Sequence, residues 1–323
     1  MNNETSLNLL TDKWLPVRLQ DGSVIKIKIA EIGRADIVDI VSPRADFRCA
    51  IYQLLLGLLQ VVFRPANRKE WLKHWQAPPD AEDLGTVFSP HIAAFEINTP
   101  IGTPAFMQDL NLFEGENKAI DAMLIEAPGG KTLKDNQDHF IKRGRVEGLS
   151  PWSAVLALFT LQINAPSGGV GHRVSLRGGG PLTTLVLPPE SSRCNTLWHR
   201  LWLNVLTQEE VERLPGNSDM TEPEAIFPWM ALTRTSEKKG METYPEKVHL
   251  LQAYWSMPRR MRLHFSSEKH VCDLTGEQAN ESVNSFHTKN YGINYSGSWV
   301  HPLTPYVFET GKEPLSIKAQ PGG

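Results

Sequence analysis

The sequence has few cysteines, and they are not arranged in pairs. Its 323 residues include Cys49, Cys194 and Cys272, which lie far apart and form no C-x-x-C motif. An odd, scattered set argues against a disulfide framework and against a cysteine-rich zinc site. The pattern is typical of a reducing compartment, so we expect a cytoplasmic protein that binds no metal and no other cofactor.

The chain also lacks a strong excess of charge and a long apolar run. Its formal net charge is −3, which excludes a uniformly basic coat for nucleic acid but leaves room for a local basic patch. The longest apolar run, residues 51–63, is shorter than the roughly 20 residues that span a bilayer. It predicts a core helix, and we expect no membrane partner. The polar N-terminus does not resemble a signal peptide.

Hydrophobic residues make up 41% of the chain, enough for a sizeable core. Short helical and strand patterns occur without a βαβ rhythm, which predicts an α+β fold of mixed helices and short antiparallel strands. The length would allow two domains. We interpret residues 1–315 as one large irregular globular domain, followed by a disordered tail at 316–323.

Several segments have a clear secondary-structure pattern. Residues 8–32 alternate polar and apolar positions around Asp21-Gly22, which predicts a hairpin. Trp71 and Trp75 are one helical turn apart, and we expect them to pack in the core. Helices are predicted at 47–62, 151–164 and 196–207, and strands at 181–188, 261–265 and 291–299.

The most unusual stretch is NAPSGGVGHRVSLRGGG, residues 164–180. It does not contain the P-loop pattern, and Gly169-Val170-Gly171 does not extend to the full dinucleotide-binding fingerprint. The stretch follows a predicted helix and precedes a predicted strand, the reverse of the order that such a fingerprint needs. A nucleotide-dependent enzyme is therefore disfavoured.

This glycine-rich block has two parts. SLRGGG (175–180) has ordinary turn chemistry, and we interpret it as a tight turn. In SGGVGHR (167–173), Gly168, Gly169, Val170 and Gly171 offer a nearly bare backbone that another molecule can approach closely. His172 and Arg173 follow directly and favour an anionic partner, such as the phosphates of a duplex. A catalytic role for His172 has less support, because no nucleophile or carboxylate lies at a telling spacing.

A second basic grouping occurs in the long polar segment 127–150. Lys142 and Arg143 lie beside Phe140 there, and an aromatic ring next to cations could stack on a nucleobase. A solvated loop anchored by one phenylalanine is the alternative. The segment is longer than an ordinary connection, which favours a functional or disordered loop.

A third basic grouping is Arg259, Arg260 and Arg262 in MPRRMRLHF. On a strand, Arg260 and Arg262 would share one face, because side chains alternate with period two. That face could be a phosphate track, or it could be a soluble edge that carries charge. The pattern does not decide between them.

Motifs along the whole chain occur in a recognisable order. They are NLLTDKWLPVR (8–18), PAFMQDL (104–110), the long block at 138–186, LWLNVL (201–206), YWSMPRRMRL (254–263) and SGSWVHPLTPY (296–306). Together they resemble the large subunit of the type I-E CRISPR interference complex, Cascade, a family often called CasA. The glycine-rich block is the most specific of these motifs.

The resemblance implies a non-catalytic subunit. Guide RNA reads the target by pairing, while this subunit checks the short flanking motif, the PAM, in double-stranded DNA and helps to start unwinding. It implies that residues 168–171 approach the minor groove, whose degenerate pattern would tolerate related motifs. A family lysine in that groove corresponds to Lys289, with Asn290 as the alternative. A family phenylalanine near the RNA 5′ handle or the PAM corresponds to Phe140.

The implied partners are double-stranded target DNA, the CRISPR RNA 5′ handle, the other Cascade subunits and the helicase-nuclease effector. Family members continue well past residue 323, into a wedge loop and a C-terminal four-helix bundle that we expect this chain to lack. Some members carry a cysteine cluster where this sequence has only Cys272. We therefore expect no zinc site here.

Two other functions stay open from the residues alone. The chain could be a structural scaffold subunit without direct DNA readout, in which the glycines serve only as turns. It could also be a metal-dependent nuclease, which would need clustered carboxylates. Asp135 with Asp138 and Glu209 with Glu210 are candidates, but no basic catalytic residue accompanies either pair.

Overall fold

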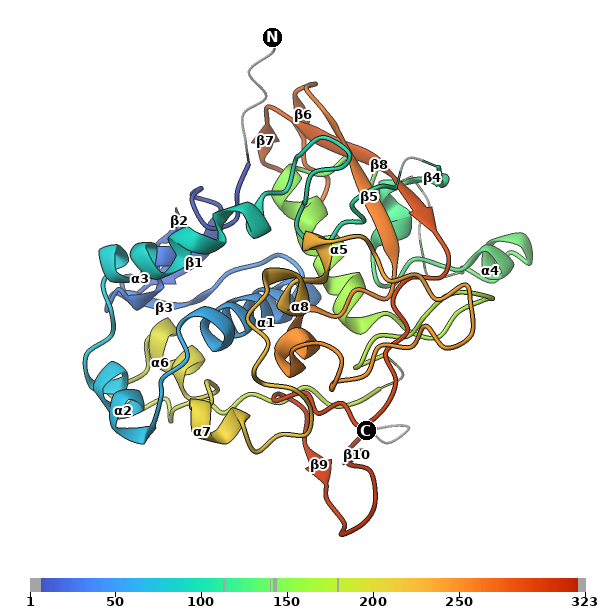
Figure 1. The fold of residues 1–323 in the computed structure, drawn as a ribbon. Helices are drawn as coiled ribbons and strands as arrows, with labels where there is room; N and C mark the ends of the chain where they lie inside the picture. Colours follow the sequence, from blue (N-terminus) through green and yellow to red (C-terminus); the bar gives the residue numbers. More distant parts are fainter. Residues whose placement is uncertain (1–6, 113, 140, 142–143, 179, 319–323) are drawn as a thin grey trace.

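A computed structural model describes residues 7–112, 114–139, 141, 144–178 and 180–318. Figure 1 shows helices gathered around α1 and α5, with small sheets at the edges of the domain. This arrangement confirms the predicted α+β domain of mixed helices and short antiparallel strands. The helices are α1 (Ala45–Val62), α2 (Arg68–Gln76), α3 (Ala81–Phe88), α4 (Gly130–Lys134), α5 (Pro151–Asn164), α6 (Leu197–Trp202), α7 (Gln208–Val211) and α8 (Pro223–Ile226).

Short 3-10 helices connect these elements, and every strand pairing is antiparallel. The 3-10 helices are η1 (Ile29–Gly33), η2 (Ser89–Phe95), η3 (Ile120–Met123), η4 (Pro228–Met230) and η5 (Leu250–Trp255). The strands are β1 (Leu15–Leu19), β2 (Val24–Ile27), β3 (Ile37–Ile40), β4 (Glu116–Ala119), β5 (Arg260–Ser266), β6 (His270–Val271), β7 (Gln278–Ala279), β8 (Ser282–Lys289), β9 (Tyr306–Val307) and β10 (Leu315–Ser316). Their sheet orders are β2-β1-β3, β4-β8-β5, β6-β7 and β9-β10.

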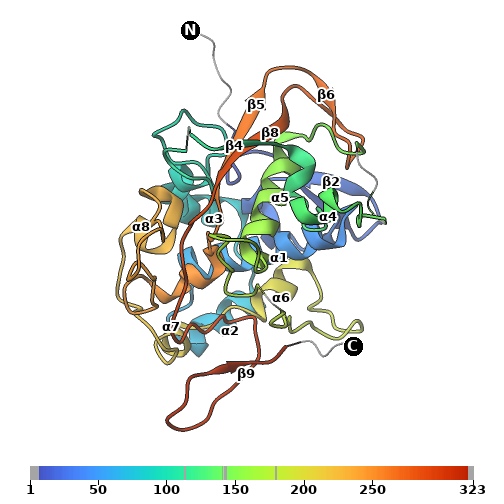
Figure 2. The same cartoon turned by 90° about the vertical axis from the view of Figure 1, so that its right-hand side faces the viewer.

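The core forms around α1, and α5 packs against it (Figure 2). By length and composition α1 could cross a membrane, but most of its residues are buried inside the protein. This is the predicted core helix, and it ends at Val62, with Phe63 as its C-cap residue, before Pro65. Proline stops a helix because its ring clashes with the preceding turn and it has no N–H to donate.

Aromatic side chains fill much of the remaining interior. Trp71 and Trp75 stack with ring centroids 5.6 Å apart, and Trp71 also stacks on Trp202. The indole of Trp71 donates to the carbonyl of Val205 at 3.1 Å. Both tryptophans pack against the core, as their helical spacing predicts.

The predicted N-terminal hairpin is confirmed. β1 pairs with β2 from Leu15↔Ile27 to Arg18↔Val24, and Gly22 in the turn has a φ of 86°. Glycine adopts this left-handed conformation without the steric cost that a Cβ would bring.

Two predicted strands are wrong. Residues 181–188 form no strand: Pro181 makes an isolated bridge, and the backbone of Val186 pairs with the side-chain amide of Asn204 instead. Residues 291–299 are also irregular, because the chain turns at Tyr291, with a φ of 65°, and at Gly297. The strand that pairs with β5 is β8, which lies earlier in the sequence.

Two predicted boundaries shift as well. The helix expected at 196–207 is α6, which ends at Trp202. The expected tail at 316–323 begins inside β10, where Ser316 pairs with Tyr306 and the amide of Ile317 donates to the carbonyl of Pro305. The backbone groups at the start of the expected tail are therefore hydrogen-bonded to the rest of the domain, which orders them. Residues 319–323 lie outside the described ranges.

Candidate nucleic-acid interface

The loop that follows α5 has a closed base and an exposed tip. Ser175 closes the base: its amide donates to the carbonyl of Ala165 at 3.0 Å, and its hydroxyl donates to the carbonyl of Ile163 at 2.9 Å. Residues 166–170 are exposed, and the side chain of Val170 is 81% exposed. The amide of His172 donates to the carbonyl of Gly169 at 3.0 Å, which makes a tight turn at the tip. The fold thus presents the nearly bare segment to solvent.

The glycines of the tip have different structural roles. A Cβ on Gly171 would lie 2.8 Å from the Cβ of Asn290, and its φ of 77° disfavours other residues. A Cβ on Gly168 would lie 2.8 Å from the Cβ of His172. At Gly169 a Cβ would meet no described atom within 4 Å. The protein's own packing therefore explains Gly171 and Gly168, but it does not require a glycine at 169.

The end of β8 holds the tip in place. The side-chain amide of Asn290 donates to the carbonyl of Val170 at 2.8 Å, and the amide of Tyr291 donates to the carbonyl of Gly171 at 2.8 Å. Lys289, the last residue of β8, is exposed directly beside these contacts. The fold thus brings together the glycines and Lys289, which are more than a hundred positions apart in the sequence.

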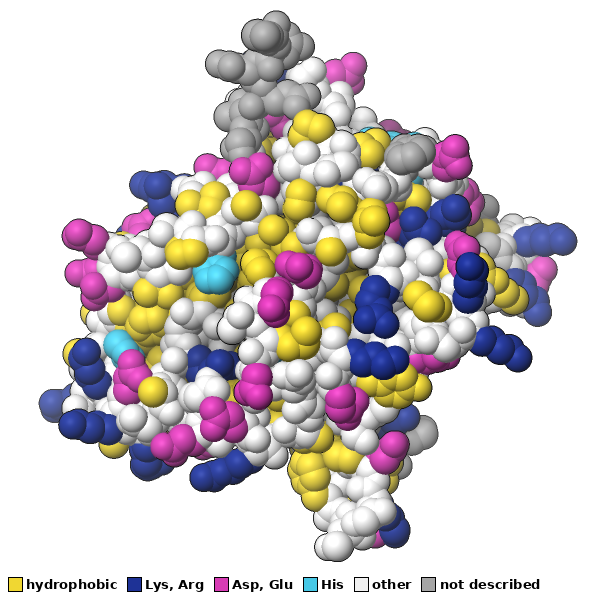
Figure 3. Space-filling model, in the orientation of Figure 1, with side chains coloured by type: hydrophobic (Ala, Val, Ile, Leu, Met, Phe, Trp, Pro, Cys, Tyr) yellow, Lys and Arg dark blue, Asp and Glu magenta, His cyan; other side chains and the backbone are white. Residues whose placement is uncertain are grey.

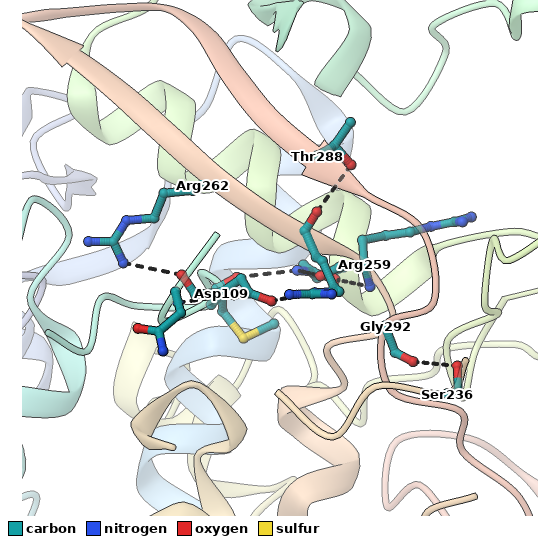
Figure 4. Close-up of polar contacts among 10 residues, drawn as sticks. Asp109, Ser236, Arg259, Arg262, Thr288 and Gly292 are labelled. Atoms are coloured by element: carbon teal, nitrogen blue, oxygen red, sulfur yellow. Dashed lines mark hydrogen bonds and ion pairs between the residues drawn. The ribbon is translucent and has the colours of Figure 1, made fainter. Parts of the chain in front are cut away.

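Arg173 braces the same loop from its other side. Its guanidinium donates to the hydroxyl of Ser236 at 2.7 Å and to the Ser236 carbonyl at 2.8 Å, and it lies over the ring of Tyr291. Ser236 in turn donates to the carbonyl of Gly292 at 2.7 Å (Figure 4). Part of the bonding capacity of Arg173 is therefore used within the protein. Its contact with DNA stays a prediction.

Positive charge gathers around the tip. Desolvation lowers the pKa of His172, and the charges of Arg259 and Lys118 lower it further. The imidazole is therefore neutral at pH 7. Lys118 is ion-paired with Glu116 at 3.3 Å, so Lys289 rather than His172 is the exposed cation beside the tip. Figure 3 shows Lys and Arg side chains along the right-hand side of this face, the side on which α4 and β4 lie in Figure 1.

The chain matches one protein family over nearly its whole length. The family described as CRISPR-associated protein Cse1 matches residues 8–323. This chain belongs to the Cse1 family. The resemblance drawn from its sequence motifs is therefore confirmed.

Solved Cse1 structures have the same fold. Cse1 of Acidimicrobium ferrooxidans matches with a TM-score of 0.66 and 16% identity, over 99% of this chain and 59% of that one. CasA (Cse1) of Thermus thermophilus gives a TM-score of 0.65 and 19% identity, over 97% and 60%. A chain of the structure titled "CRISPR RNA-guided surveillance complex, pre-nicking" gives 0.67 and 15%, over 98% and 61%. This Cse1 chain thus spans about three-fifths of the length of these solved chains.

The arginines of the third basic grouping have a structural role in this Cse1 chain. Arg260 forms an ion pair with Asp109 at 2.7 Å, and Arg262, which is 4% exposed, donates to several carbonyls, including that of Asp109 (Figure 4). Arg259 donates to the carbonyl of Pro166 at 2.7 Å. Both earlier interpretations of Arg260 and Arg262 are therefore wrong: they are neither a phosphate track nor a soluble edge.

The predicted contact loop lies partly outside the described residues. Phe140, Lys142 and Arg143 belong to the undescribed positions, so their contact with RNA or DNA stays a prediction. Described residues of the same segment include α4 and Arg145, which lines a cavity of about 620 Å³ together with Arg44 and Glu126. Arg44 is ion-paired with Asp46 and Glu126 there.

Two of the carboxylates considered for a nuclease have structural roles. Glu210 accepts the amide of Thr207 at 2.8 Å in a capping box at the start of α7. Asp135 ends α4 as its C-cap residue. Across the described ranges, no three His, Cys, Asp or Glu side chains gather as metal ligands would.

Sequence reasoning missed Lys118, Ser236 and Tyr291, the residues that surround or brace the tip. Lys118 and Ser236 lie about fifty and sixty positions from the loop and belong to no motif, so no sequence pattern marks them. Tyr291 falls within the strand predicted at 291–299, although it turns the chain with a left-handed φ.

Proposed function

We propose that this chain is a non-catalytic subunit of a CRISPR RNA-guided surveillance complex, and that its glycine tip recognises the PAM in double-stranded DNA and supports unwinding. Membership of the Cse1 family supports the assignment to such a complex. So does the fold shared with chains of structures titled as CRISPR RNA-guided surveillance complexes. The other subunits, the guide RNA 5′ handle and the helicase-nuclease effector are the proposed partners, in the cytoplasm.

One observation supports the proposed DNA contact. Gly169 lies at an exposed tip, where the fold itself leaves room for a side chain. Close approach to a nucleic-acid groove requires a residue without a side chain, because any side chain would hold the groove away. Gly169 meets this requirement, although the fold itself does not need a glycine there. Lys289, which is exposed beside the tip at the end of β8, supplies positive charge for a phosphate.

The exposed end of β8 supplies the second contact. Lys289 and Asn290 are both exposed next to the tip. The side-chain amide of Asn290 is bonded to the carbonyl of Val170. Lys289 is exposed and makes no such bond to another described residue. We assign the groove-facing role to Lys289 on this ground.

The decisive experiment replaces Gly169 by leucine in the assembled complex. A duplex library with randomised flanking positions reports the motif preference through enrichment of bound sequences. Gly169→Leu should reduce affinity for the preferred motif about tenfold or more, because the side chain prevents groove contact. The thermal midpoint should stay near wild type, because the added side chain meets open space.

Gly85→Leu is the matched control. Gly85 lies in α3, and a Cβ there also meets open space. This variant should keep wild-type motif preference. If Gly169→Leu keeps it too, the tip does not read DNA and the scaffold function gains support.

Lys289→Ala tests the electrostatic part of the proposal. If Lys289 neutralises one phosphate, the slope of log affinity against log salt should fall by about 0.9, uniformly across sequences. An unchanged slope would show that Lys289 contacts no phosphate. Titration of the complex at several salt concentrations gives this slope.

A further inference from the structure

Arg177 is a buried cation whose partners in the described chain are all neutral. Its side chain is 5% exposed, and its guanidinium donates to the side-chain oxygen of Gln53 and to the hydroxyl of Thr183. Burial lowers its pKa to about 10, so the group remains charged at pH 7. A buried charge without an opposite charge is costly, and proteins normally pair it.

Two unpaired polar groups lie in the same region. The hydroxyl of Tyr254 and the Nε2 atom of His301 are buried and have no hydrogen-bond partner among the described residues. Their rings are close, with centroids 4.9 Å apart. Arg177 lies within electrostatic range of both. Buried polar groups are rarely left unpaired, so such a cluster needs an explanation.

The tautomer of His301 shows what kind of partner is missing. Its Nδ1 accepts the amide of Leu303 at 3.1 Å, so the proton of the neutral ring is on Nε2. Burial, together with the positive charge of Arg177, holds the pKa of His301 well below its ordinary value, so the ring is neutral. The unpaired Nε2–H is therefore a donor. The hydroxyl of Tyr254 can donate as well, and a guanidinium can only donate.

We propose that Arg177, His301 and Tyr254 bind a small monovalent anion of the chloride type. Three donor groups, one of them charged, lie in one buried region where the described residues supply no anionic acceptor. The three groups carry one positive charge between them, which favours a monovalent anion over a doubly charged phosphate. The anion would tie the base of the glycine-rich block to the WVHP segment at 299–302.

The first test compares anions at constant ionic strength. The thermal midpoint of the wild-type protein should be a few degrees higher in sodium chloride than in sodium gluconate, whose anion is too large for the site. Equal midpoints in both salts would overturn the proposal, and would indicate that a water molecule satisfies these donors. The wild-type measurement decides this even if a variant fails to fold.

Variants then locate the effect. Arg177→Met should lose the chloride response, because it removes the charged donor. Arg64→Met is the matched control, since Arg64 also has a buried unpaired Nη1 but lies within range of the Glu212 carboxylate. Arg64→Met should keep the response. A chloride response that persists in Arg177→Met would place the anion elsewhere and contradict the assignment.

Bromide gives a direct readout. Crystals soaked in sodium bromide should show an anomalous peak within hydrogen-bond distance of Arg177 and of Nε2 of His301. No peak there, together with peaks at surface lysines, would mean an adventitious ion only and would overturn the site. This outcome is independent of the proposed function, because it needs no DNA and no complex.

Discussion

The tip and the base of the glycine-rich block have similar composition and opposite environments. At the tip, Gly169 is exposed and a Cβ there would meet open space. At the base, Ser175 and Arg177 are buried, and a Cβ on Gly178 would lie 2.0 Å from the carbonyl oxygen of Ala165. Glycines of one block are thus present for different reasons: Gly178 because the protein packs against itself, and Gly169 because it leaves room for a partner.

The largest expected effect comes from Gly178→Ala at the base. The added methyl would also lie 2.5 Å from the side chain of Val174, so the turn must open. We expect a loss of about 3 kcal/mol in the free energy of unfolding, measured by urea denaturation. Gly169→Ala should change this free energy by less than about 0.5 kcal/mol. Equal losses in the two variants would remove the distinction between tip and base.

Gly171→Ala should have an intermediate effect. It lies at the tip, but its positive φ and the contact with Asn290 make a side chain unfavourable. The left-handed conformation costs other residues about 1–2 kcal/mol, and the loss should appear in urea denaturation. Motif binding should fall as well, because the tip shifts away from Asn290. A variant with weakened binding and wild-type stability would show that the fold does not require this glycine.

The smallest expected effect is a difference in pH dependence. The pKa of His301 beneath the base is held well below its ordinary value, whereas the pKa of His172 at the tip is lowered less. Between pH 7.5 and 5.5 the unfolded chain takes up a proton at His301 and the folded chain does not, so stability falls on acidification. The contribution is at most about 1.4 kcal/mol, since one pH unit separates 5.5 from the unfolded pKa of about 6.5.

His301→Asn should reduce this acid sensitivity, because asparagine does not titrate and its side-chain oxygen, near the position of Nδ1, can still accept the amide of Leu303. His172→Gln should reduce it less. Urea denaturation at the two pH values measures both slopes. If the two variants have the same slope, the burial of His301 does not control its protonation.

Local sequence patterns predicted the elements that depend on local chemistry. The hairpin at Asp21-Gly22, the core helices α1 and α5, and the turn after Ser175 follow from turn residues and apolar runs. The strand predicted at 291–299 failed because Tyr291 adopts a left-handed φ, which no residue pattern signals for a tyrosine. The strand predicted at 181–188 failed because the side chain of Asn204 pairs with the backbone of Val186.

The candidate site was only partly predictable for a related reason. The glycines are visible in the sequence, but the roles of the arginines depend on distant partners. Arg260 pairs with Asp109, and Arg173 pairs with Ser236. Composition alone presents all of these arginines as candidates for phosphate contact. Only the fold separates the cations that are used internally from those left at the surface.

The hydrogen bonds from Asn290 and Tyr291 to the tip have a consequence for engineering. Because these bonds fasten the glycines to the end of β8, the tip and Lys289 keep a fixed separation and move as one piece. Transplanting residues 167–173 alone into a relative would therefore leave the loop without the hydrogen bonds from Asn290 and Tyr291 that hold it in place. A chimera intended to exchange DNA preference should carry the loop and the strand end together.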